Sequence, residues 1–104
     1  MVAPRFDDLI HPSTRLSIVA LLAAADWIDF GYVRDRLELS DSALSKQFTT
    51  LEEAGYVRLE REATGRQRRV RVRLTQTGRD AFEGHVAALR EVLAGTTASS
   101  DALS

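Results

Sequence analysis

The chain has 104 residues, 44% of them hydrophobic and none of them cysteine, which predicts one compact domain and excludes disulfide bonds and thiolate metal sites. Its longest apolar run, residues 18–25, is too short to span a membrane, and because no signal-peptide pattern is visible we expect a cytoplasmic protein. The net charge of −1 conceals a strong asymmetry, because positions 58–73 carry +5 and the remainder −6, which predicts a local positive field.

The first predicted helix follows a lead-in segment, residues 1–10, whose large apolar side chains are expected to pack against the domain. Pro12 suits the first turn of a helix, and the helix is expected to run to about Ala25. From Ile18 onward this helix is apolar on nearly every side. A helix of this kind is covered on more than one face, so we expect a second surface besides the core to pack on it.

Two further helices are predicted on either side of a short turn. Asp26–Asp29 is predicted to form a turn with a minimal edge strand, and a second helix is predicted at about residues 30–37, with Val33 among its buried side chains. Leu39 and Ser40 then form a short turn into a third helix. Two helices joined in this way are typical of the helix-turn-helix unit, whose second helix reads DNA.

The third predicted helix spans residues 41–54. Ser40 is a good N-cap, and Gly55 can adopt the left-handed conformation that ends a helix. Apolar residues at i, i+4 and i+7 predict one buried stripe: Leu44, Phe48 and Leu51. The opposite face carries small polar residues around one cation, as a helix that enters a DNA major groove requires: Ser42, Ser45, Lys46 and Thr49. Taken alone, this face also fits an ordinary solvated helix surface.

After Gly55 the apolar residues recur at every second position, which predicts a two-stranded β-hairpin with a loop around Gly65. One face of the hairpin is apolar and is expected to pack on the helices, whereas the other face and the tip are rich in arginine. An exposed hairpin ordinarily mixes lysine with acidic residues, so repeated arginine favours a polyanionic partner. Three arginines of the second strand have an alternative, which is pairing with nearby acids: Arg69, Arg71 and Arg73.

A last helix is predicted from Gln76 to about Leu93, with Thr75 as its cap. Residues 95–104 are small and polar and are predicted to form a disordered tail, so the predicted domain comprises residues 1–94.

The order helix, short strand, helix, helix, hairpin, helix resembles the winged-helix DNA-binding domain of small bacterial and archaeal transcriptional regulators related to the MarR and ArsR groups. Three stretches carry the resemblance: DDLIHPSTRLSIVALL (7–22), LSDSALSKQFTTLEEAGYV (39–57) and GRQRRVRVRLTQTGRDAF (65–82). It implies a winged helix-turn-helix fold, mainly α with a small β-hairpin (α+β), and a dimeric regulator. Helix 41–54 would lie in the major groove of double-stranded DNA, and the wing, residues 58–74, would lie on the backbone or the minor groove. The resemblance transfers no effector ligand.

These patterns predict two sets of functional residues. The expected DNA contacts are Ser42, Ser45, Lys46, Thr49, Arg66, Arg68 and Arg69. The two terminal helices carry more apolar surface than one small domain can cover, which predicts a homodimer on an inverted-repeat promoter site. The expected dimer contacts are Leu16, Val19, Phe82, Val86, Leu89 and Leu93.

Other functions are weaker hypotheses. A winged-helix module for protein–protein contact remains an alternative, although such interfaces usually depend on apolar hot spots and not on an arginine-rich wing. No catalytic set can be assembled, so we do not expect an enzyme. His11 and His85 lack a cluster of further ligands and are expected to pack in the fold, so neither a metal nor a cofactor is predicted.

Overall fold

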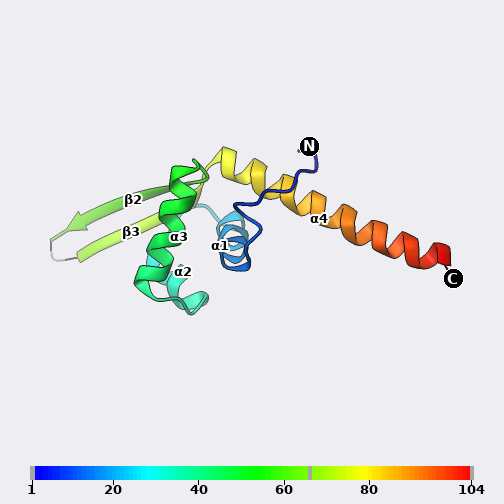
Figure 1. The fold of residues 1–104 in the computed structure, drawn as a ribbon. Coiled ribbons are helices and arrows are strands. Elements are labelled where there is room, and N and C mark those ends of the chain that lie inside the picture. Colours follow the sequence, from blue (N-terminus) through cyan, green and yellow to red (C-terminus); the bar gives the residue numbers. More distant parts are fainter. Residues whose placement is uncertain (1, 66, 104) are drawn as a thin grey trace.

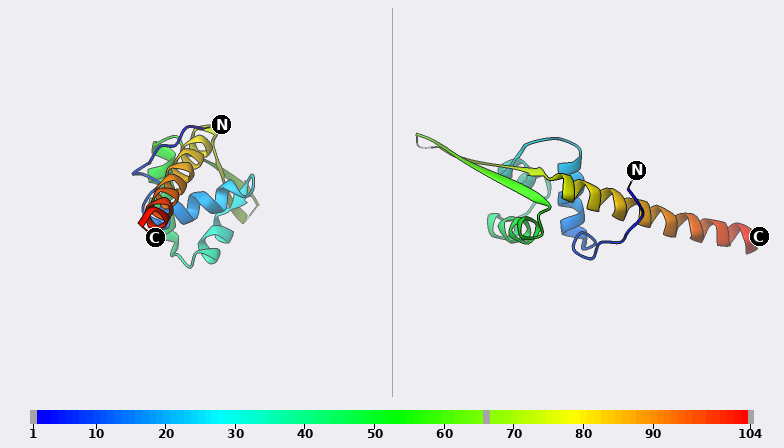
Figure 2. Two further views of the ribbon diagram at one scale, coloured as in Figure 1. Left: turned by 90° about the vertical axis from the view of Figure 1, so that its right-hand side faces the viewer. Right: turned by 90° about the horizontal axis from the view of Figure 1, so that it is seen from above.

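The computed structural model describes the backbone of residues 2–65 and 67–103, and the side chains of the same residues except 64, 67 and 96–103. The elements in chain order are α1 (Ser13–Ala23), β1 (Ile28–Asp29), α2 (Phe30–Arg36), α3 (Asp41–Glu53), β2 (Val57–Thr64), β3 (Gln67–Leu74) and α4 (Gln76–Leu103). The molecule is elongated, at 65 × 27 × 20 Å, because the hairpin and α4 extend from opposite ends of a body formed by α1, α2 and α3 (Figures 1 and 2). The predicted winged helix-turn-helix architecture is confirmed.

The three strands form one antiparallel sheet in the order β1–β3–β2. The predicted hairpin is present, and the minimal edge strand expected before α2 pairs with β3 through Ile28 opposite Val72. Val72 also faces Leu59 of β2, so apolar side chains from all three strands share the face that packs on the helices. The hairpin continues beyond this apolar patch, and its outer part extends away from the helices (Figure 1).

Helix α3 has the ends and the buried face that the sequence predicts. The Ser40 hydroxyl accepts a hydrogen bond from the Ala43 N–H at 3.1 Å, and Gly55 adopts φ = 78° just beyond the C-terminus. Leu44, Phe48 and Leu51 are at most 1% exposed. The polar face of α3 therefore points away from the body of the protein.

The hydrophobic core joins the helices to the apolar face of the sheet. Its fully buried side chains include Ile10, Ile18, Val19, Leu22, Val33, Leu44, Leu51 and Val72. Val19 was among the predicted dimer contacts, and the structure corrects this prediction. Its side chain packs inside its own chain and has no exposed surface to offer a second copy. The reason is that α1 is apolar on several sides, so its sequence does not indicate which side faces the core.

Helix α4 begins against the junction between α3 and β2. The Thr75 hydroxyl accepts from the Gly78 N–H and donates to the Gly55 carbonyl, so it caps α4 and ties it to the end of α3. Gly78 is required here, because a Cβ atom would lie 2.1 Å from the Tyr56 carbonyl oxygen.

Helix α4 continues to Leu103, whereas the sequence pattern placed its end near Leu93. The extension contains no proline, and its alanine, serine and threonine residues are compatible with a helix that is already nucleated. The division into a domain, residues 1–94, and a disordered tail, residues 95–104, remains a prediction. In the described part of the chain, no helix is long and apolar enough to cross a membrane.

Candidate nucleic-acid interface

The exposed face of α3 carries the predicted polar residues. Ser42, Ser45, Lys46 and Thr49 are all exposed. The Thr49 hydroxyl donates to the Ser45 carbonyl at 2.9 Å, so its oxygen remains available as an acceptor. The small side chains on either side of Lys46 allow a close approach to this face, and the lysine supplies its positive charge.

Contacts from α1 and α2 fix the position of α3. The Arg34 guanidinium of α2 lies 2.9 Å from Asp35 and 3.0 Å from Asp41, the first residue of α3. These hydrogen bonds raise the pKa of Arg34 and lower the pKa of Asp35, although both groups are solvent-accessible. From α1, Arg15 donates to the side chain of Gln47 at 3.2 Å. The exposed face of α3 is therefore presented by a helix held from two sides.

On the outer face of the sheet, which points away from α3, arginines of β3 are paired with acids. The pairs are Arg69 with Asp29 (2.9 Å), Arg71 with Glu60 (2.6 Å) and Glu62 (3.3 Å), and Arg73 with Asp26 (3.3 Å). The hydrogen bond from Arg71 lowers the pKa of Glu60, and the one from Arg69 lowers the pKa of Asp29, so both carboxylates are charged at neutral pH. Pairing with acids, the alternative that the sequence left open, is therefore present for all three arginines.

Trp27 covers part of the same outer face. The guanidinium carbons of Arg71 and Arg73 lie 5.2 and 5.4 Å from the centre of its ring. The outer face is therefore a packed layer of arginines, carboxylates and one indole, in which most of the positive charge is compensated.

The inner face, which points towards α3, has a different charge balance. Arg61 and Arg68 lie an even number of positions from the core residues of their strands, so they point to the same face as those residues and share it with Val70. Both are exposed, and neither forms an ion pair with another described residue. Two arginines without an ion pair among the described residues, Arg61 and Arg68, therefore face the same side as α3, whereas the exposed Arg58 lies on the outer face.

A hollow of about 320 Å³ separates the wing from α3. Its walls include Ser45 and Thr49 of α3 and Arg61 of the wing, together with the acidic side chains of Asp41 and Glu52. The structure thus brings the predicted α3 face and the wing to two sides of one groove. Arg61 was absent from the predicted site, although its spacing of two residues from Leu59 and four from Val57 placed it on their inner face.

The remaining predicted residues lie in several environments. Arg66 lies outside the described residues, and Arg69 is engaged with Asp29. Of the expected dimer contacts, four are partly buried in the single chain: Leu16, Phe82, Val86 and Leu89. Leu93 is 66% exposed. Among the described residues, no group of three or more histidine or acidic side chains is arranged to hold a metal ion.

A family model described as a winged helix DNA-binding domain matches residues 14–93, which contain α2, α3, the sheet and most of α1 and α4. The chain is also similar to uncharacterized protein MJ0432 of Methanocaldococcus jannaschii. The two are 29% identical over 78 residues, which is 75% of this chain and 85% of the relative.

Solved structures share the fold. A transcriptional regulator homologue from Pyrococcus horikoshii OT3 superimposes with a TM-score of 0.80 at 23% identity, over 85% of this chain and 87% of the other. The M. tuberculosis transcriptional regulator MOSR, solved in complex with DNA, gives a TM-score of 0.67 at 25% identity, over 88% of this chain and 65% of that protein. MarR family regulators are also among the structural neighbours.

Proposed function

The chain belongs to the family of winged helix DNA-binding domains, and from this premise we propose that it is a transcriptional regulator that occupies an inverted-repeat promoter site as a homodimer. The fold is that of DNA-binding regulators and not of enzymes. One observation carries the proposal. Ser45 and Thr49 of the exposed polar face of α3 line the same groove as Arg61, an arginine of the inner wing face that is unpaired among the described residues.

In the proposed complex, α3 lies in the major groove and the wing contacts the backbone or the minor groove. Lys46 provides the strongest contact from α3, either to a phosphate or to a guanine edge, while Ser42, Ser45 and Thr49 bind bases, phosphates or bridging water. From the wing, Arg61 and Arg68 supply the main positive charge. Arg66 and Arg69 complete the proposed set, and Arg69 contributes less because Asp29 already neutralises it.

The homodimer is proposed to form through α4 and neighbouring apolar surface. Val92 and Leu93 are 51% and 66% exposed, so they offer adjacent apolar surface near the exposed end of the described part of α4. A twofold dimer built on α4 would bury these side chains and would place two copies of α3 about 34 Å apart, or a multiple of that distance, on one side of the DNA.

Replacing Lys46 with alanine tests the role of α3. We expect Lys46→Ala to weaken binding by about 1–3 kcal/mol where the lysine meets a base, and to relax the sequence preference at that position. The melting temperature should barely change, because Lys46 is exposed and lies opposite the buried stripe. Binding is measured by titration of a duplex selected from random sequences, and stability by circular dichroism.

Arg90→Ala is the matched control, because it removes one positive charge from an exposed position of α4 without altering α3. It should bind the selected duplex with nearly the affinity of the unmodified protein. Equal binding by the Lys46 variant would remove α3 from the interface. Failure of the unmodified protein to bind any duplex at low salt would favour the alternative function, a protein–protein interaction module.

A further inference from the structure

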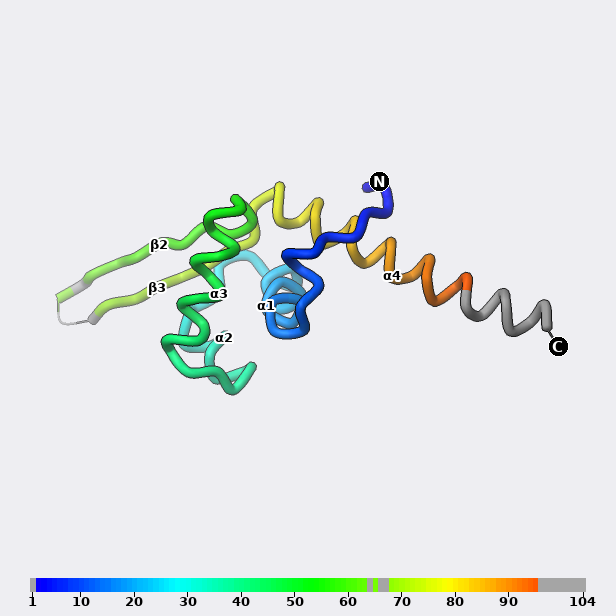
Figure 3. The backbone as a smooth tube through the Cα atoms, viewed as in Figure 1, coloured from blue at the N-terminus to red at the C-terminus, as the bar shows by residue number. Residues whose placement is uncertain are grey.

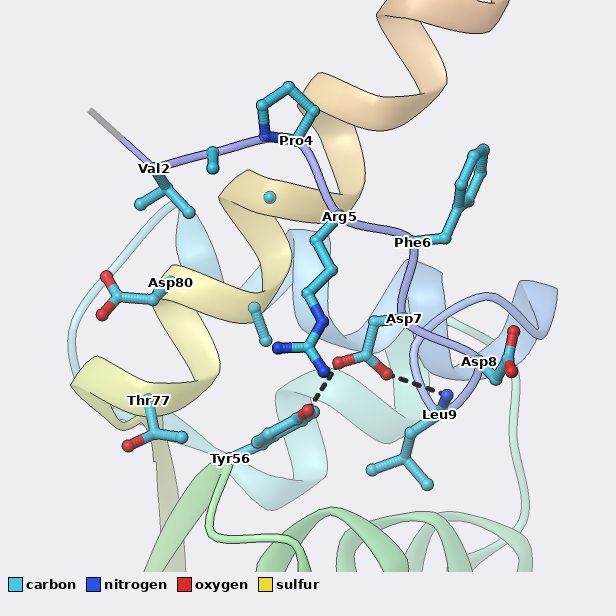
Figure 4. A pocket seen from close by; sticks show the side chains of 13 residues that line it. Val2, Pro4, Arg5, Phe6, Asp7, Asp8, Leu9, Tyr56, Thr77 and Asp80 are labelled. Carbon is cyan, nitrogen blue, oxygen red and sulfur yellow. Dashed lines mark hydrogen bonds between the residues drawn. The ribbon is translucent and has the colours of Figure 1, made fainter.

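Residues 2–11, which we call the N-terminal strap, run across α4 towards the end of α3 (Figures 3 and 4). The Arg5 N–H donates to the Gly84 carbonyl of α4 at 2.9 Å. A Cβ atom on Gly84 would lie 3.1 Å from the Ala3 carbonyl oxygen, so the glycine permits this close crossing. At the other end of the strap, Ile10 is fully buried in the core. The strap is therefore held at several points and follows one defined path.

His85 of α4 lies beneath the strap and is fully buried, alone in this respect among the polar and charged residues that the structure describes. Its Nδ1 atom accepts a hydrogen bond from the Asp7 N–H at 3.0 Å, and its Nε2 atom lies 3.3 Å from Nδ1 of His11. Because Nδ1 is an acceptor, the proton of the neutral imidazole is on Nε2, which donates to His11. The ring of Phe6 packs edge-on against His85, with the centroids 5.6 Å apart. This arrangement requires an uncharged His85.

Asp7 extends the same network to α3. Its carboxylate accepts a hydrogen bond from the Tyr56 hydroxyl at 2.5 Å and a second from the Leu9 N–H at 2.9 Å (Figure 4). Donation to Asp7 raises the pKa of Tyr56 to about 12, so the hydroxyl keeps its proton. The Tyr56 N–H in turn donates to the Leu51 carbonyl in the last turn of α3. A continuous set of hydrogen bonds thus links His85, the strap and the end of α3.

Protonation of His85 is incompatible with this network. A proton on Nδ1 would face the Asp7 N–H, so one hydrogen bond would be lost and a cation would be created in a buried site. Burial lowers the pKa of His85 and His11 lowers it further, while Asp7 and Asp8 act in the opposite direction. Helix α1 also packs on α4, but its Arg15 is directed to the Leu9 carbonyl and to Gln47. The charged groups that act on His85 therefore belong to the strap.

We propose that the strap is a proton-sensitive latch on the DNA-reading helix. It is closed while His85 is neutral and opens when His85 binds a proton, which frees Tyr56 from Asp7 and loosens the end of α3. Opening of the strap is a property of the chain alone, whereas its effect on DNA affinity rests on the proposed function. The strap, together with Thr77 and Asp80 of α4, also lines a cavity of about 790 Å³ (Figure 4). This cavity would widen when the strap opens.

The sign of the pH dependence follows from the two states of His85. An exposed histidine titrates near about pH 6.5, whereas the buried His85 of the closed state titrates lower, so the open state binds the proton more tightly. Above about pH 6.5 the closed state keeps its full stability. Below that pH the open fraction should rise by up to about tenfold per pH unit until the closed state is also protonated.

Amide hydrogen exchange tests the latch without DNA. Between pH 6.5 and 5.5, we expect the Asp7 and Ile10 amides to lose up to about tenfold of their protection, after correction for intrinsic exchange, while Val72 in the core keeps its protection. In His85→Asn, Oδ1 can accept the Asp7 N–H but cannot be protonated, so strap protection should not change with pH. His11→Asn should still show the loss. Protection of the unmodified strap that does not change across this range overturns the proposal.

Further measurements distinguish His85 from His11 as the titrating group, and distinguish the proposed latch from the proposed DNA-binding function. If His85→Asn does not fold, the unmodified protein and His11→Asn still identify the titrating group. A pH-dependent loss of strap protection in both proteins supports His85 as that group. If His11→Asn abolishes the loss, the proposed role of His85 is overturned. DNA affinity of the unmodified protein should fall between pH 6.5 and 5.5 by a factor that follows strap opening. A protein that binds no DNA at pH 7.5 but shows pH-dependent opening keeps the latch and refutes the proposed function.

Discussion

Leu93→Glu is expected to convert a dimer into a monomer and to weaken binding to the full inverted-repeat site by about 100-fold or more. Fully burying one leucine contributes about 1.5–3 kcal/mol, and Leu93 is 66% exposed in the single chain, so burying two copies contributes about 2–4 kcal/mol and their loss should raise the dimer dissociation constant at least about 30-fold. A charged carboxylate in the interface adds a desolvation cost. Sedimentation at micromolar concentration, alone and with DNA, measures both effects.

The single chain should tolerate Leu93→Glu, because the leucine is 66% exposed before any partner binds. Ala94→Glu is the matched control, since it introduces the same charge at the next exposed position, about 100° around the helix. The control should remain dimeric, and both variants should melt at nearly the temperature of the unmodified protein. An unmodified protein that sediments as a monomer, both free and on DNA, would refute the dimer.

The fold was predictable where its determinants are local. Ser40 begins α3 as its N-cap and Gly55 ends it in the left-handed conformation, and both roles follow from the residue type alone. The change in periodicity after Gly55 likewise predicted the hairpin, because alternating valines and leucines form a strand with one apolar face. These features depend on residues close in sequence, which is why pattern alone was sufficient.

The charge balance of the wing depends on register, and register was not predictable from the pattern. Arg71 is compensated because it lies directly opposite Glu60, and Arg69 because β1 brings Asp29 beside it. Asp29 is 40 positions away from Arg69 along the chain. The sequence therefore located the basic segment and its two faces, but it could not show which of its arginines are paired with acids.

The hydrogen-bond partner of His85 was also beyond the sequence, because Asp7 lies 78 positions away. The pattern predicted a packed histidine on α4 but gave no indication of the hydrogen-bonded path to Tyr56. For α1, an apolar surface on several sides left Val19 and Leu16 indistinguishable, although only Val19 is fully buried. Contacts between residues far apart in the sequence determine which side of α1 is buried and which group His85 contacts.

The double variant Arg61→Ala/Arg68→Ala is expected to flatten the salt dependence of DNA binding and to weaken binding to all sequences. Each phosphate contact contributes about −0.9 to the slope of log K against log salt, so two lost contacts should reduce the slope by up to about 2. The melting temperature should change little, because both arginines are exposed and neither has an ion-pair partner among the described residues. Affinity is measured from 50 to 200 mM salt with a selected duplex and with a random one.

Arg71→Ala/Arg73→Ala removes the same charge from the outer face and is the matched control. These arginines already pair with Glu60, Glu62 and Asp26 and pack on Trp27, so their removal should lower the melting temperature and alter the slope less. If both double variants flatten the slope equally, the net charge of the wing controls binding and its two faces do not differ. If only the inner-face variant does, DNA meets the wing on the side of α3, because uncompensated guanidinium groups release counterions from phosphates and paired ones do not.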